Sequence, residues 1–187
     1  MSSRGRLIVF ASPSGGGKGT VIRQLLDQHP DWGFSCSATT RAPRPGEEDG
    51  KHYYFLNRDE FQRRVAAGEF LEHEAVHSDL YGTLKSVTQE RLEQGETVIF
   101  DLDVKGALSV KRHYPEAFSI FIVPPSMAVL EQRLRGRKTE SEEVIRLRLT
   151  RAAMELGLAD QFDVRIVNDV LEQTVADVEQ AIANRFA

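Results

Sequence analysis

Short apolar runs alternate along the chain with stretches of helical periodicity. Leu7 to Ala11, Thr97 to Asp103 and Ser119 to Val123 are runs of mainly apolar residues, which are typical of strands buried on both faces of a sheet. Each run is followed by a segment in which apolar residues recur every three or four positions. This alternation predicts an α/β fold with three layers and a mainly parallel sheet.

Capping residues and chain breakers set the expected boundaries. The first helix should end near His29-Pro30, and Asn57 to Glu60 is a capping signature for a helix that Gly68 closes. Further helices are predicted over Leu84 to Gln94, Ala107 to His113, Ser126 to Leu134 and Val170 to Phe186. One more helix is predicted to begin at a cap within Thr139 to Glu142 and to end at about Leu158. Further strands are predicted at Phe34 to Ser37, Phe70 to Val76 and Phe162 to Val167.

The stretch from Ser35 to Thr83 breaks this alternation. Two prolines and two glycines lie between Ala38 and Phe55, so a long helix is excluded there and an ordered loop that ends in a strand is expected. An insertion with a small sheet of its own would explain the break. Ligands in such folds bind beyond the carboxyl ends of the strands.

A glycine-rich turn follows the first apolar run. Its sequence is Ser12-Pro13-Ser14-Gly15-Gly16-Gly17-Lys18-Gly19-Thr20. Glycines let backbone N–H groups converge on an anion, the following helix adds its positive end, and Lys18 adds a full charge. The turn therefore predicts a phosphate-binding loop, the alternative being an ordinary strand-to-helix turn.

This turn departs from the P-loop pattern at two positions. Ser12 stands where the pattern opens with glycine, and Gly19 stands where a serine or threonine hydroxyl normally ligates Mg²⁺. We therefore expect the metal to be held in another way, through water or with help from Thr20.

Composition narrows the possible partners. The 187 residues suit one domain, and the net charge of −4 argues against a general nucleic-acid binder. Cys36 is the single cysteine, which excludes an intrachain disulfide and fits a reducing cytoplasm. No apolar run is long enough for a signal sequence or a membrane span, so no membrane partner is expected. The sequence does not distinguish a monomer from a homo-oligomer.

Three further motifs resemble those of the guanylate kinase family. They are Thr39-Thr40-Arg41-Ala42-Pro43-Arg44-Pro45-Gly46-Glu47 with the later Tyr53, then Tyr81-Gly82-Thr83, and finally Asp101-Leu102-Asp103 with Arg133-Leu134-Arg135-Gly136-Arg137. They follow the family's order and spacing, and the similarity spans nearly the whole chain. The resemblance implies a P-loop NTPase-type enzyme of purine nucleotide metabolism that transfers the γ-phosphoryl group of ATP to GMP with Mg²⁺.

The same resemblance divides the single domain, 1–187, into three regions. A core covers about 1–34, 84–126 and 160–187, a small mixed α/β GMP-binding insertion covers about 35–83, and a helical lid covers about 127–159. The phosphate loop from Ser12 to Thr20 and Asn168 are then expected to bind ATP.

The resemblance assigns Arg41, Arg44, Tyr53 and Tyr81 to the GMP phosphate and includes Glu47 in the same site. The two arginines lie three residues apart in a proline-stiffened loop, so their guanidinium groups can be held in place before a ligand binds. The tyrosine hydroxyls can each donate a hydrogen bond. The alternatives are a solvated basic loop and tyrosines that pack in a core.

Glu72 and Ser37 are the expected readers of the guanine base, with Thr83 as a further contact. A carboxylate accepts two hydrogen bonds from the N1–H and exocyclic amine of guanine, whereas adenine presents an acceptor at the same edge. The alternative for Glu72 is a solvent-facing strand residue beside Glu74.

Asp101 and Asp103, two residues apart at a predicted strand end, are expected to point to the same side. Asp101 is the candidate for holding Mg²⁺ through water, and Thr20 is a second candidate. Asp103 is assigned to GMP. The family often has glutamine where this chain has Lys105, so an additional positive charge lies near these acids. Their alternative role is a pair of solvated strand-end acids.

Lys18, Arg41, Arg133, Arg137 and Arg148 are the expected catalytic residues. Arg133 and Arg137 lie four apart on a predicted helix and so face one way. The resemblance implies that this region closes over ATP and brings arginines to the transferred phosphoryl group. A solvated helix face paired with glutamates is the alternative.

Two rival functions remain open from the sequence. One is a catalytically inactive guanylate-kinase-like module that binds phosphorylated peptides through Arg41, Arg44 and Tyr53. The other is a kinase for a different monophosphate, because Lys18-Gly19-Thr20 resembles the adenylate kinase loop.

Overall fold

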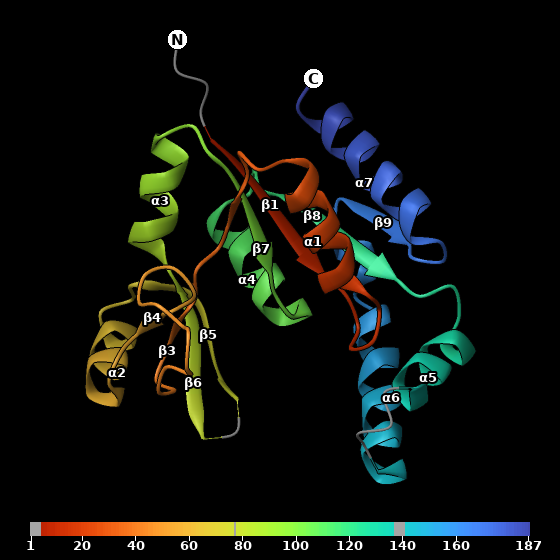
Figure 1. Cartoon of the computed structure of the whole chain (residues 1–187), viewed down its shortest axis with the longest axis horizontal. Helices are drawn as coiled ribbons and strands as arrows, with labels where there is room; N and C mark the ends of the chain where they lie inside the picture. Colours follow the sequence, from red (N-terminus) through yellow and green to blue (C-terminus); the bar gives the residue numbers. More distant parts are fainter. Residues whose placement is uncertain (1–4, 77, 137–140) are drawn as a thin grey trace.

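A parallel sheet of five strands forms the centre of the molecule (Figure 1). The computed structural model describes residues 5–76, 78–136 and 141–187. The strands lie in the order β2-β7-β1-β8-β9, and every neighbouring pair is parallel. Their bounds are β1 Arg6–Ala11, β2 Gly33–Phe34, β7 Thr97–Asp101, β8 Phe118–Val123 and β9 Val164–Val167. The predicted fold class is confirmed.

Helices cover both faces of this sheet. Helices α1 (Lys18–Gln28) and α7 (Leu171–Arg185) lie on one face, and α3 (Lys85–Glu93) and α4 (Val104–His113) lie on the other (Figure 1). Along β1, Ile8 and Phe10 pack toward α1 and α7, whereas Leu7 and Val9 pack toward α4. Because successive strand residues face opposite sides, burial of both faces requires the uninterrupted apolar run seen in the sequence.

A second sheet accounts for the break in alternation between residues 35 and 83. Its strands lie in the order β4-β3-β6-β5, with bounds β3 Ala38–Thr39, β4 Tyr54–Phe55, β5 Phe70–Val76 and β6 Asp79–Leu84. Helix α2 (Arg58–Ala66) packs Phe61 against Phe70 of this sheet with a ring-centroid distance of 4.4 Å. Asn57 caps α2 by accepting from the backbone N–H of Glu60 at 2.8 Å, as its position predicts.

Two details of the predicted strands are wrong in this region. The predicted strand from Phe34 to Ser37 ends at Phe34, because after that residue the chain leaves the edge of the central sheet to enter β3. Strand β6 was not predicted at all. Its sequence carries Gly82 in the middle, and glycine weakens the local strand signal.

Helices α5 (Met127–Gly136) and α6 (Glu142–Leu156) lie on the opposite flank from the small sheet (Figure 1). Ser126 and Ser141 cap them by accepting from backbone N–H groups at 3.2 and 3.4 Å. Ser141 falls within the predicted cap, although Thr139 of that cap and Arg137 lie outside the described residues. Within the described part of the chain no helix is both long and apolar enough to cross a membrane.

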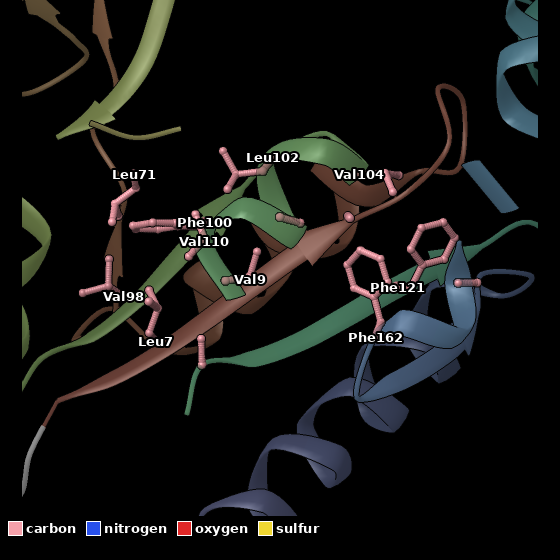
Figure 2. Close-up of a cluster of buried hydrophobic side chains, with 14 of the residues drawn as sticks. Leu7, Val9, Leu71, Val98, Phe100, Leu102, Val104, Val110, Phe121 and Phe162 are labelled. Carbon is pink, nitrogen blue, oxygen red and sulfur yellow. The ribbon is translucent and has the colours of Figure 1, made fainter. Parts of the chain in front are cut away.

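A β-bulge in β5 attaches the small sheet to the central core. Phe70 pairs with Leu84 and Glu72 pairs with Thr83, so Leu71 is the extra residue. The Leu71 side chain is 3% exposed and belongs to the same apolar cluster as Phe100 and Leu102 (Figure 2). Leu71 therefore fixes the position of its neighbour Glu72.

Replacement of Leu71 by alanine tests this attachment. We expect Leu71→Ala to lower the free energy of unfolding by about 2–4 kcal/mol, because it removes a buried side chain that joins the two sheets. Chemical denaturation of the variant measures this change. Leu147→Ala is the matched control, since Leu147 is 70% exposed and its loss should change stability little. Equal stability changes in the two variants would show that Leu71 does not anchor the small sheet.

Candidate active site between two cavities

The phosphate loop is held against the end of β9. Gly17 has φ +90°, and a Cβ atom there would lie 2.1 Å from Nδ2 of Asn168. That amide group donates to the backbone carbonyl of Gly16 at 2.8 Å, and the Asn168 side chain is buried. Both the left-handed backbone and this close contact require glycine at position 17. Asn168 was predicted as an ATP contact, and in the structure its amide is engaged with the loop itself.

Positive groups converge where the loop enters α1. The Nζ atom of Lys18 lies 2.5 Å from Oδ1 of Asp101 and also contacts the carbonyl of Leu102. The first turn of α1 carries no acidic residue, and its N-cap, Gly17, supplies no side-chain cap. The N–H groups of this turn and the lysine ammonium therefore form a site suited to phosphate.

A cavity of about 900 Å³ opens over this loop. We call it the phosphate-loop cavity. Its lining comprises Ser12, Pro13, Ser14, Gly15, Gly17, Lys18, Gly19, Thr20 and Arg23 from the loop and α1, Asp101, Leu102 and Asp103 from the end of β7, and Val144, Leu147, Arg148, Arg151 and Glu155 from α6. Most residues predicted to bind ATP are thus brought together in one cavity.

A second cavity of about 250 Å³ lies against the small sheet. We call it the sheet cavity. It is lined by Ser37, Tyr53, Glu72, Glu74, Tyr81, Gly82, Asp101, Leu102 and Asp103. The register explains why these side chains meet, since Glu72 lies opposite Thr83 and Glu74 opposite Tyr81 on paired strands. The segment Asp101 to Asp103 forms a wall of both cavities.

Asp101 and Asp103 reach this wall in a different way from the one predicted. Strand β7 ends at Asp101, and Asp103 is the N-cap of α4, where its Oδ1 accepts from the N–H of Gly106 at 2.7 Å. The strand predicted to run to Asp103 is therefore two residues too long, because the capping preference of aspartate starts α4 at Val104. Both carboxylates nevertheless line both cavities.

Glu72 is a carboxylate of the sheet cavity that is largely withdrawn from water. Burial raises its pKa, and nearby Glu74 and Asp103 act in the same direction. The Thr83 hydroxyl opposes this shift by donating to Oε1 of Glu72 at 2.6 Å. Glu72 and Thr83 thus form the polar pair that the sequence predicted for recognition of a base.

Arg41 lies two residues after the end of β3 and is held by several neighbouring groups. Its Nη2 donates to Glu47 at 2.8 Å and its Nη1 donates to the carbonyl of Ala42 at 2.7 Å. The hydrogen bond with Glu47 raises the pKa of Arg41, and Tyr81 adds a smaller effect. The guanidinium also lies 5.3 Å from the ring centroid of Tyr53. Three of the predicted phosphate ligands are therefore neighbours.

Glu47 organises this loop in addition to pairing with Arg41. Its second oxygen accepts from the backbone N–H of Arg44 at 2.7 Å, and these two hydrogen bonds lower the pKa of Glu47 to about 2. The expectation that both guanidinium groups are fixed in advance holds for Arg41. Arg44 is held through its backbone, and the residue is exposed.

Two of the three predicted lid arginines lie beside the phosphate loop. Arg148 of α6 donates to the Ser14 hydroxyl at 2.8 Å, and Arg133 of α5 donates to the carbonyl of Asn168 at 2.8 Å. The Nη1 atom of Arg133 is buried without a hydrogen-bond partner among the described residues. Arg137 lies outside the described residues.

Several residues that line these cavities were missed in the sequence, and they include three charged residues whose spacing was informative. Glu74 lines the sheet cavity, and Arg151 and Glu155 line the phosphate-loop cavity. Glu74 follows Glu72 by two positions on one strand, and Arg151 follows Arg148 by three on one helix. These spacings are the signals that could have identified them.

The arrangement fits Mg²⁺ with few protein ligands. Asp101 and Thr20 both line the phosphate-loop cavity, and a side chain at Gly19 would meet no heavy atom within 4 Å. Within the described residues, no group of three or more acidic, histidine or cysteine side chains could hold a metal. Asp101 and Thr20, the two residues predicted to hold the ion, are therefore placed in the same cavity.

Comparisons with known proteins agree with this geometry. The guanylate kinase family model matches residues 4–185. A guanylate kinase of Chlorobium luteolum is 49% identical over 181 residues, covering 96% of this chain and 92% of the relative. One from Trichormus variabilis is 47% identical over 180 residues, covering 96% and 90%. The crystal structure of a guanylate kinase from Anaplasma phagocytophilum, 34% identical, superposes with a TM-score of 0.73 and covers 97% of this chain and 86% of that one.

The buried carboxylate of Glu72 should reduce stability at neutral pH. A carboxyl whose pKa is raised by folding is destabilising when ionised, and this cost disappears below its unfolded pKa, where both states are protonated. We therefore expect Glu72→Gln to raise the melting temperature at pH 7 and to lose this gain as the pH falls toward 4. Thermal unfolding across this range measures it. The exposed Glu143→Gln is the control, and a gain that does not depend on pH would contradict the assignment.

Proposed function

The chain belongs to the guanylate kinase family, and we propose that its two adjoining cavities hold the ATP and the GMP between which it transfers a phosphoryl group. The observation that carries the proposal is the common wall formed by Asp101, Leu102 and Asp103. On one side of this wall lie the glycine loop and Lys18. On the other side lie the tyrosines and Glu72 of the small sheet. Two ligands bound on either side would therefore be neighbours.

ATP would bind with its phosphates in the phosphate-loop cavity. Backbone N–H groups and Lys18 would hold the phosphates, and Arg148 already reaches this cavity from α6. Arg133 presents a buried nitrogen near Gly17, since its Nη1 would lie 4.0 Å from a Cβ at that position. These cations are suited to stabilising negative charge on the transferred group, so positioning and electrostatics would supply most of the rate.

GMP would bind in the sheet cavity. Arg41, Arg44, Tyr53 and Tyr81 would contact its phosphate, with Arg41 fixed by Glu47 before binding. Glu72 would accept hydrogen bonds from the N1–H and exocyclic amine of guanine, with Ser37, Thr83 and Asp103 as further contacts. Those two donors would favour the ionised carboxylate and so compensate for its burial.

Asp101 would hold Mg²⁺ through water, with Thr20 as a second contact. When bound, the ion neutralises charge on the β- and γ-phosphate oxygens. Lys18 lies against Asp101 and would keep this carboxylate oriented toward the cavity. We also propose that the protein acts in the cytoplasm in purine nucleotide metabolism, which the nature of its substrates and its single cysteine support.

A coupled assay for ADP release tests the proposed substrate assignment. We expect turnover with GMP and little with AMP, and Glu72→Gln should lower kcat/KM for GMP by about a hundredfold or more, because a recognition site built for hydrogen bonding loses its charged acceptor. Glu143→Gln is again the control. A protein that binds phosphopeptides would release no ADP with either nucleotide. An unchanged preference for GMP over AMP in Glu72→Gln would refute the role of Glu72.

Position 19 offers a test of how the metal is held. We expect Gly19→Ser to fold normally, because its Cβ would meet nothing within 4 Å, and to reach half-maximal activity at a lower Mg²⁺ concentration, because serine supplies a hydroxyl ligand. Titration of activity with Mg²⁺ measures the effect. Gly136→Ser is a matched control, since a Cβ there also meets nothing within 4 Å. Identical Mg²⁺ dependence in both variants would argue against an ion beside position 19.

A further inference from the structure

Helix α6 contacts the walls of both cavities through two arginines on one face. Arg148 donates to Ser14 of the phosphate loop at 2.8 Å. Three residues later, Nη2 of Arg151 lies 3.3 Å from Oδ2 of Asp103, which also lines the sheet cavity. Residues three apart lie on the same face of a helix, so a single placement of α6 allows both contacts to form.

Arg151 is fixed at its other end by Glu155. Its Nε donates to Oε1 of Glu155 at 2.8 Å, and the Glu155 side chain is only 12% exposed. This hydrogen bond raises the pKa of Arg151, and the charges of Asp103 and Glu74 add to the shift. The guanidinium therefore bridges a carboxylate of its own helix and one at the end of β7.

Asp103 is consequently held by both of its oxygens. Oδ1 accepts from the N–H of Gly106 in the first turn of α4, and Oδ2 faces Arg151. The first contact belongs to the loop that carries Asp103. The second comes from α6, which is far away in the sequence, so the orientation of Asp103 depends on where α6 lies.

A cavity of about 460 Å³ surrounds this bridge. Its charged lining residues are Glu74, Asp103, Lys105, Arg151 and Glu155. The pKa of Glu74 is raised by burial and by the charge of Asp103, and Arg151 and Lys105 offset part of this shift. Lys105, the additional cation noted in the sequence, therefore offsets part of the acidic charge here. Without Arg151, Lys105 would be the only cation among the lining residues of this cavity, beside the carboxylates of Glu74, Asp103 and Glu155.

We propose that Arg151 is a positioning residue that couples GMP binding to ATP binding, by tying the orientation of Asp103 to the position of α6. The proposal rests on the proposed function, in which Asp103 contacts GMP. ATP phosphates attract Arg148, which biases α6 toward the phosphate loop, and the same helix carries Arg151 to Asp103. Because such coupling is reciprocal, GMP tightens ATP binding by the same factor.

Steady-state kinetics provide the first test. Arg151→Gln raises KM for GMP at saturating ATP and KM for ATP at saturating GMP by the same factor of about five, while kcat changes less than about twofold. Arg146→Gln is the matched control, because Arg146 lies exposed on the same helix and has no contact with either cavity wall among the described residues. Equal KM values for GMP in Arg151→Gln and the unmodified protein overturn the proposal.

Calorimetry measures the coupling directly. In the unmodified protein, GMP binds more tightly when a non-hydrolysable ATP analogue and Mg²⁺ are present, and in Arg151→Gln this gain falls to about onefold. The gain persists in Arg146→Gln. An equal gain in Arg151→Gln overturns the proposal, and so does the absence of any gain in the unmodified protein.

Two further measurements separate positioning from simpler effects. Arg151 is 58% exposed but is the partner of Glu155, so Arg151→Gln lowers the melting temperature only slightly, whereas a large loss of stability together with a loss of affinity for each nucleotide measured alone would indicate a structural role only. Arg151→Lys recovers part of the coupling, since an ammonium keeps the charge but not the two-ended guanidinium bridge. Full recovery of the coupling in Arg151→Lys would indicate that the positive charge alone is sufficient, and would overturn the proposed role of the guanidinium bridge. Failure of the proposed function is distinct, because the unmodified protein would then show no GMP turnover.

Discussion

The burial of Leu102 at the end of β7 is the constraint on which both cavities depend. Its side chain is 8% exposed in the central core, and its N–H donates to the carbonyl of Phe10 at 3.1 Å. With Leu102 fixed inward, Asp101 and Asp103 on either side of it are presented at the cavity wall. Asp101 meets Lys18, and Asp103 caps α4 and meets Arg151. A single buried leucine thus fixes two carboxylates with different partners.

The bulge at Leu71 orients a cavity residue of the small sheet in the same way that Leu102 orients those at the end of β7. It turns an apolar side chain into the core so that Glu72, the next residue, faces the sheet cavity. Burial of that carboxylate costs stability, and the Thr83 hydroxyl offsets only part of the cost. The fold therefore holds at the sheet cavity a carboxylate that is unfavourable for stability, an arrangement that is common at functional sites.

Much of this architecture could be predicted from local signals. The buried strands, the caps at Asn57 and Ser141 and the phosphate loop depend on neighbouring residues, and the structure contains them. Strand β6 escaped prediction because its pairing partners β3 and β5 stabilise it despite Gly82. The bridge from Arg151 to Asp103 also escaped, since it joins residues 48 positions apart and depends on how α6 packs. The local sequence pattern does not specify contacts between residues that are far apart in the chain.

The unsatisfied polar atoms of the described chain lie together in the α5–α6 region, where the geometry is not optimised for stability alone. In the part of the chain that the structure describes, the buried side-chain polar atoms without a hydrogen-bond partner are Nη1 of Arg133 and Oε2 of Glu155. Each costs about 1–3 kcal/mol of stability when left unsatisfied. Both belong to this one region, Arg133 beside the phosphate loop and Glu155 behind Arg151. Elsewhere in the described chain the buried side-chain polar atoms have hydrogen-bond partners, so this cost is concentrated on α5 and α6.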